Sequence, residues 1–92
     1  MKYCKLLLAF LLFSPITWAN EAQTYYEKAI QLRAGANLNE AEIAVKNSIK
    51  LDPDYVPARI LLGEILLGKG QASSAEKELE TALALNADTN TV

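Results

Sequence analysis

The sequence predicts an all-α protein of antiparallel helix-turn-helix pairs, stacked as a short α-solenoid. Three observations support this prediction. The stretch 22–55 aligns without a gap on the stretch 56–89, with identities such as Leu32 and Leu66. Small and apolar residues recur at spacings of three and four, as on one face of a helix. Glycine and proline stand between these segments. A repeat of this length, about 34 residues, is typical of stacked helical hairpins.

Residues 1–19 differ in composition from the repeats. Two lysines precede an apolar run at 6–13, and the segment ends in a small residue, Ala19. This order is typical of a secretory signal peptide, so we predict that residues 1–19 are removed and that 20–92 form the mature domain. The alternative is an uncleaved membrane anchor, but the run is shorter than the roughly 20 residues of a spanning helix. We therefore expect export, with only transient membrane contact through this segment.

Removal of the signal would change the charge and the redox chemistry of the chain. Lys2, Lys5 and the single cysteine, Cys4, leave with it, so seven basic residues remain against eleven acidic ones, a formal charge of −4. The basic residues are scattered among carboxylates, which argues against binding of nucleic acid. No internal disulfide can form in the mature chain, so its stability must come from packing.

The first repeat is predicted to hold helices on both sides of a glycine turn. The first helix spans about 22–34, and we expect Gly35 to end it in the left-handed conformation. Asn39 and Glu42 have the spacing of a capping box, which would start the second helix. The turn 51–54 ends this helix because it contains a proline. Its buried face is predicted from the spacing of Ala41, Val45, Ser48 and Ile49.

The second repeat begins with a helix at about 55–67. Asp54 is the expected N-cap, and Pro57 stands in the first turn, where proline is tolerated. Gly68 and Gly70 are expected to close this helix before a tight turn.

The last helix is predicted to start at a second capping box, formed by Ser73 and Glu76. Its buried face comprises Ala75, Leu79, Ala82 and Leu83. Only a short polar tail, 86–92, follows, which is too short to cover an apolar edge. Because two repeats form a small core, we expect this helix to mediate self-association or to stack on further repeats.

With these elements placed, the chain resembles two tetratricopeptide repeats that follow a signal peptide. The resemblance extends from Ala22 to about Asp88. Lys28, Arg59 and Ala87 depart from it, because the family more often has an apolar residue, an aromatic residue and a proline at these positions. The strongest matches are the small residues at three positions of each repeat: Ala29, Gly63, Ala41, Ala75, Ser48 and Ala82.

The resemblance implies a concave groove lined by the first helices of the two repeats. In this groove Arg33 and Glu64 would pair with charges of a partner, and the apolar residues would bury its apolar surface, which suits an extended peptide or a helix. The alternative is that Tyr26 and Ile60 only pack against a neighbouring repeat. The groove positions correspond to Gln23, Tyr26, Ile30, Arg33, Ile60, Glu64 and Leu67.

Catalysis is not expected from this sequence. The chain has no histidine, and the mature chain would have no thiol, so its serines lack an evident base and no soft metal site can form. No cofactor is expected either. The resemblance implies an exported, periplasmic protein that binds other proteins: a scaffold or assembly factor of envelope, secretion, pilus or exopolysaccharide machinery. The alternative is the amino-terminal part of a longer repeat array, with a purely structural role.

Overall fold

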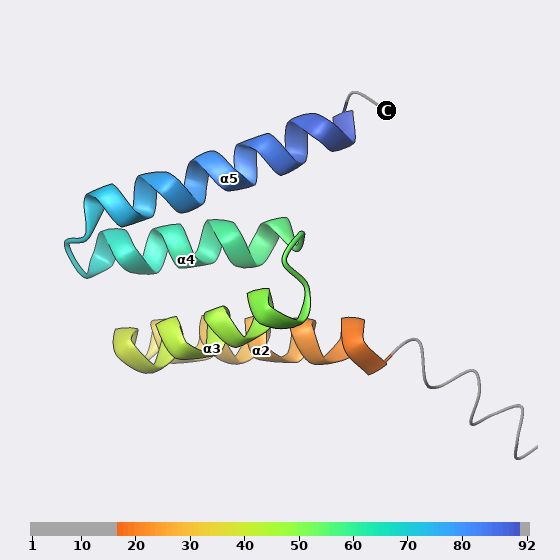
Figure 1. Cartoon of the computed structure of the whole chain (residues 1–92). Coiled ribbons are helices and arrows are strands. Elements are labelled where there is room, and N and C mark those ends of the chain that lie inside the picture. The colour runs from red at the N-terminus through yellow and green to blue at the C-terminus, as the bar shows by residue number, and fades with distance from the viewer. Residues whose placement is uncertain (1–16, 91–92) are drawn as a thin grey trace, which may run out of the picture.

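A computed structural model describes residues 17–90, and the side chains of residues 21–86. It contains the helices α2 (Thr17–Ala34), α3 (Leu38–Leu51), α4 (Val56–Gly68) and α5 (Ala72–Asn90). The helices form two antiparallel pairs, α2 with α3 and α4 with α5, stacked one on the other (Figure 1). The described part of the chain has no strand, so the predicted all-α architecture of paired helices is confirmed there. Residues 1–16 of the predicted signal segment lie outside it.

The turns after α2 and α4 have the same backbone structure. In the first, Ala36 N–H bonds to Arg33 O at 3.0 Å and Asn37 N–H bonds to Leu32 O at 2.9 Å. This pair of bonds defines a Schellman motif, whose left-handed residue is Ala36, with φ of 64°. The prediction that Gly35 takes this conformation is therefore wrong. The reason is that Gly35 still continues the helical hydrogen bonding, since its N–H bonds to Gln31 O at 3.1 Å.

In the second of these turns the left-handed residue is Gly70, with φ of 79°. Gly70 is the residue of the second repeat that aligns with Ala36. The two repeats therefore share the same hydrogen-bond pattern in their turns as well as the same helices. The predicted closing role of Gly70 is confirmed, whereas Gly68 is the last residue of α4 itself.

Both predicted capping boxes are wrong. Helix α3 has Asn37 as its N-cap without a side-chain bond, so Asn39 is already inside the helix. Ser73 likewise lies inside α5, which begins at Ala72. The physical reason is the Schellman turn, after which the chain enters α3 at once. The first helical hydrogen bond, from Ala41 N–H to Asn37 O at 2.9 Å, therefore begins two residues before Asn39. Tight connection and packing thus override the local capping preference.

The connection between the two pairs follows the prediction more closely. Helix α3 ends at Leu51, and Pro57 stands in the first turn of α4. The N-cap of α4 is Tyr55, however, and not Asp54 as predicted. The backbone N–H of Asp54 instead bonds to Asp52 Oδ1 at 3.3 Å, so the two aspartates stabilise the turn between the pairs.

The core runs through the stack between successive helices. Helix α4 packs against both α3 and α5, and it is the most apolar of the described helices. Small residues let the helices approach closely, and leucine and isoleucine fill the remaining space. None of the described helices combines the length and hydropathy needed to cross a bilayer. The core cluster contains Ala29, Ala41, Ala44, Val45, Ala58, Leu61, Leu62, Ile65, Leu66 and Ala75.

Candidate interaction surfaces

The seven predicted groove residues all lie on the first helices of the two pairs, and we call them the α2–α4 strip. The strip carries exposed apolar side chains: Ile30 and Ile60 are each 41% exposed, and Leu67 is 52% exposed. Exposed side chains of this size can bury apolar surface of a partner. Its members are Gln23, Tyr26, Ile30 and Arg33 on α2, and Ile60, Glu64 and Leu67 on α4.

Two charged members of the strip pair with each other. Arg33 Nη1 lies 3.2 Å from Glu64 Oε2, which joins α2 to α4, and both side chains are about two-fifths exposed. An ion pair this exposed contributes at most about 1 kcal/mol, so it can be exchanged for contacts with a partner at small cost. The charges on this surface are therefore mutually compensated in the absence of a partner.

Tyr26 is partly a core residue. Its ring meets the ring of Tyr55 edge to face, with centroids 5.4 Å apart and planes at 78°. Both rings pack against the core cluster, and burial raises the pKa of the Tyr55 phenol above its ordinary value of 10.0. This contact supports the packing interpretation for Tyr26, which joins the first repeat to the start of the second. Gln23 is exposed and donates from Nε2 to Glu27 Oε1 at 3.3 Å.

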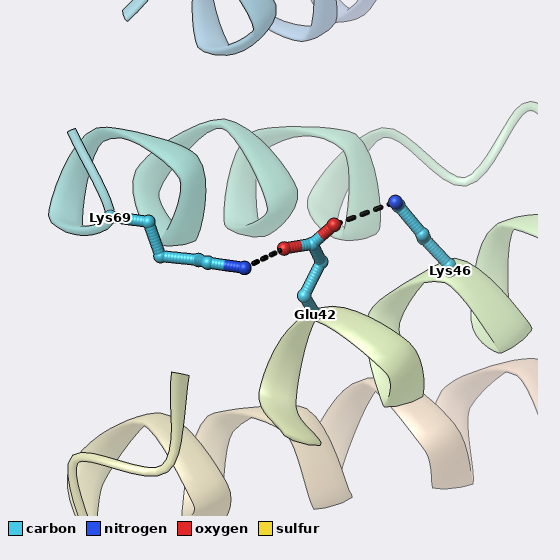
Figure 2. A network of polar contacts seen from close by, with 3 residues as sticks. All are labelled: Glu42, Lys46 and Lys69. Atoms are coloured by element: carbon cyan, nitrogen blue, oxygen red, sulfur yellow. Dashed lines mark hydrogen bonds and ion pairs between the residues drawn. The ribbon is translucent and has the colours of Figure 1, made fainter. Parts of the chain in front are cut away.

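A second polar cluster joins α3 to the end of α4. Glu42 accepts one bond from Lys46 Nζ and one from Lys69 Nζ, each at 2.6 Å, and its two oxygens point to different lysines (Figure 2). The bonds from Lys46 and Lys69 lower the pKa of Glu42 below its ordinary value of 4.5. The sequence shows the one-turn spacing of Glu42 and Lys46, but no local signal indicates Lys69. This cluster is a structural link between the pairs.

Arg59, which departs from the family pattern, links α4 to α5 and to the turn that precedes α4. Its Nη1 lies 3.1 Å from Glu78 Oε1 on α5, and its Nε donates to Pro53 O at 3.2 Å. Both charged side chains are largely buried, so the pair orients α5 on α4. This role of Arg59 could not be predicted from the sequence, because Glu78 is one of several carboxylates on a helix that is expected to expose them to solvent.

An apolar depression of about 280 Å³ opens between α4 and α5, and we call it the outer hollow. None of its lining residues is charged, and Leu83 at its rim is 69% exposed. The prediction that Leu83 lies on the buried face of the last helix is therefore wrong, because no described element covers this side of α5, and Leu83 instead forms part of an open apolar edge. The contribution of the start of α4 to this edge was not predicted. The lining residues are Val56, Ile60, Leu79, Ala82, Leu83 and Asn86.

A more polar depression lies on the first pair, between α2 and α3. Its lining includes Lys28 and Glu40 together with the exposed Ile43, so charged and apolar side chains both contribute to it. Among the residues that the structure describes, no three metal-binding side chains lie together, and every buried side-chain polar atom has a partner. The surfaces of the described residues therefore have apolar area and charged groups that a binding partner could contact.

Comparison with known proteins gives one family match. A family model described as tetratricopeptide repeat matches residues 32–91, well over half of the chain. The match begins inside α2 and covers α3, α4 and α5. No curated protein and no solved structure gives a significant match.

Proposed function

Because the chain belongs to the tetratricopeptide repeat family, we propose that it is an exported, non-catalytic module that binds a protein partner on its α2–α4 strip. Repeats of this family mediate protein–protein contacts. The observation that carries the proposal is the group of exposed apolar residues Ile30, Ile60 and Leu67 around the Arg33–Glu64 ion pair. An extended peptide or an amphipathic helix has the alternation of apolar and charged groups that fits this strip.

The ion pair gives the strip a means of selecting its partner. A partner that presents a carboxylate to Arg33 and a cation to Glu64 replaces one exposed pair by two, at little loss of intramolecular stability. A partner with the opposite order of charges would meet repulsion at both positions. The proposed binding is therefore directional along the α2–α4 strip.

The strip is tested by site-specific photo-crosslinking in cells that express the whole chain. A photoreactive residue at Leu67 is expected to crosslink to a discrete protein, and the matched control is the same residue at Ile43. Ile43 is 62% exposed on α3, outside the strip, so it reports contacts that do not depend on the strip. Equal crosslinking from both positions, or none from Leu67, contradicts the proposed binding surface.

Export is the second part of the proposal, and its support is the order of residues in 1–19. Cleavage after Ala19 would leave Ala22 in place, whose carbonyl accepts a bond from Ser48 Oγ at 2.6 Å inside the core. Periplasmic scaffolding of envelope, secretion, pilus or exopolysaccharide machinery is the role that we infer from this combination. The mass of the accumulated protein tests export: a full-length mass contradicts signal removal and favours the alternative, an uncleaved anchor.

A different observation supports two further proposals about the same chain. The outer hollow leaves apolar surface of α4 and α5 open, which favours association through the last helix. The occupant is either a second copy of the chain or a following repeat, in which case the chain would be the amino-terminal part of a longer array with a structural role. A second copy would give an assembly of defined size from this chain alone, whereas a missing repeat would leave the chain a monomer.

A further inference from the structure

The outer hollow is formed by residues of the second repeat whose equivalents in the first repeat are covered by the following helix. The alignment of the two repeats relates its lining to Ala22, Tyr26, Val45, Ser48, Ile49 and Asp52. Val45 is completely buried, whereas its equivalent Leu79 is only half-buried. Ile49 packs against the core, whereas its equivalent Leu83 is 69% exposed. In the first repeat this surface is covered by α4 and the turn before it, as the Tyr26–Tyr55 contact shows.

The covering face of α4 is apolar, and the same face of α2 is polar. On α4 it consists of buried residues: Ala58, Leu61, Leu62 and Ile65. Their equivalents on α2 are exposed: Thr24, Glu27, Lys28 and Gln31. The α2 helix of a second copy could cover the outer hollow only by desolvating Glu27 and Lys28 against apolar residues, which is strongly unfavourable. The chain is thus unsuited to head-to-tail stacking.

The outer hollow is, by contrast, complementary to itself. It combines a projecting apolar side chain, Leu83, with a recess whose floor includes the small residue Ala82. Arg59 and Glu78, which adjoin the lining residues Ile60 and Leu79 in the sequence, already pair with each other, so closing the hollow would leave neither of these two charges without its partner. Glu80, one turn before Leu83, is exposed and would have to stay in solvent at the edge of the contact. Helix α5 is outermost and diverges from α4 toward its C-terminal end, where the hollow opens (Figure 1). A projection beside a recess is what a two-fold contact requires.

We propose that two copies of this chain pair through their outer hollows about a two-fold axis, with Leu83 of each copy seated in the hollow of the other. This inference rests on the proposed association through the last helix and gives it a geometry. The polar face of α2 limits the assembly to two copies, because it offers no second apolar surface on which a further copy could stack. The α2–α4 strips of both copies remain available to a partner, apart from Ile60, which belongs to both surfaces.

The test is the concentration dependence of mass, measured by sedimentation on the protein purified after expression of the whole chain. A single step from one copy to two is expected. Leu83→Glu should raise the dissociation constant at least about tenfold, because it places a charge in an apolar contact. Ile43→Glu is the matched control, since it introduces the same charge at a similarly exposed isoleucine and should leave the constant unchanged.

A disulfide test reports the symmetry itself and does not depend on tolerance of the glutamate. Leu83→Cys in a Cys4→Ser background should give a covalent pair under mild oxidation, because Leu83 itself lines the hollow in which the Leu83 of the other copy is seated, so the two substituted positions are neighbours across the axis. Ile43→Cys in the same background should not. A monomer at all concentrations, a ladder of sizes beyond two, or no preference for position 83 overturns the proposal. If Leu67 still crosslinks to its partner in the Leu83→Glu variant, partner binding on the α2–α4 strip does not depend on pairing through the outer hollow.

Discussion

Helix α4 packs tightly against α5 at Gly63, and the two repeats fill this equivalent space with different residues. A Cβ atom on Gly63 would lie 2.8 Å from both Cγ and Cδ2 of Leu79. Because Cγ is the branch point of the side chain, Leu79 must shift as a whole to admit a methyl group. The equivalent positions of the first pair hold Ala29 and Val45, both completely buried. Gly63 with Leu79 and Ala29 with Val45 contain the same number of side-chain carbon atoms.

This equivalence makes the double substitution the informative one. Overpacking by Gly63→Ala should cost about 1–3 kcal/mol, partly offset by the roughly 1 kcal/mol by which alanine is the better helix former. Leu79→Val alone leaves a gap and should cost about 1 kcal/mol. Together they recreate the pair of the first repeat, so the clash and the gap cancel. We expect the double variant to be within about 1 kcal/mol of the natural protein. The favourable coupling is then the sum of the avoided clash and the avoided gap, about 2–4 kcal/mol.

The coupling is measured by urea unfolding followed by circular dichroism, with all four proteins at one low concentration, so that association does not alter the apparent stability. The helix propensity of alanine contributes equally to both variants that carry Gly63→Ala and therefore cancels in the coupling. A double variant that loses the sum of the two single effects, within about 0.5 kcal/mol, would refute the idea that packing volume is exchanged between these positions.

Three further predictions follow from features of the turns and the charges. Ala36→Gly should stabilise the protein by about 0.5–1 kcal/mol in the same unfolding assay, because glycine removes the strain of the left-handed conformation at φ of 64°; unchanged or lower stability would contradict this. The lowered pKa of Glu42 stabilises the folded state above its ordinary value of 4.5, and this contribution is lost as pH falls through the lower folded-state pKa; acid titration of stability should therefore be flatter in Glu42→Gln than in the exposed control Glu40→Gln, and equal curves would count against the link. Lys28→Leu combined with Gln31→Ile gives α2 part of the covering face of α4, so copies can stack head to tail in place of the two-fold contact, and sedimentation should then show assemblies larger than two copies; no increase in size would contradict the role assigned to the polar face.

The fold could be predicted because the residues that repeat are the small and apolar ones, which determine how closely the helices pack. Ala41 and Ala75, at equivalent positions, are both completely buried, as the pattern of small residues indicated. The starts of α3 and α5 could not be predicted from Asn39 and Ser73, since the turn geometry that precedes them determines where the helix begins. Before α3 that geometry depends on Ala36, a residue type that does not indicate a left-handed turn, whereas the turn before α5 has Gly70 at the equivalent position.

The candidate surfaces were only partly predictable, for a related reason. The register places Arg33 and Glu64 on the first helices, but whether they meet depends on the angle between the pairs, which is a property of packing. The bond from Lys69 to Glu42 joins residues far apart in the sequence and depends on the same angle. The polarity of Lys28 was visible as a departure from the family. The consequence of this polarity, that α2 cannot cover the outer hollow of another copy, depends on the burial of the equivalent residue, Leu62.

The position of α4 between α3 and α5 also has a consequence for the motions of the native protein. Stacked repeats unfold from their ends, because each end element has only one neighbour. Amide hydrogens of α4 should therefore exchange last, and those of the outermost helix α5 should exchange through local opening. Each such opening bares Gly63 on α4, which is buried against Leu79 in the closed state. A molecule seated on the outer hollow would hold α5 closed, so its binding would be recorded as slower exchange along the part of α4 beyond Val56 and Ile60, the α4 residues that line the hollow.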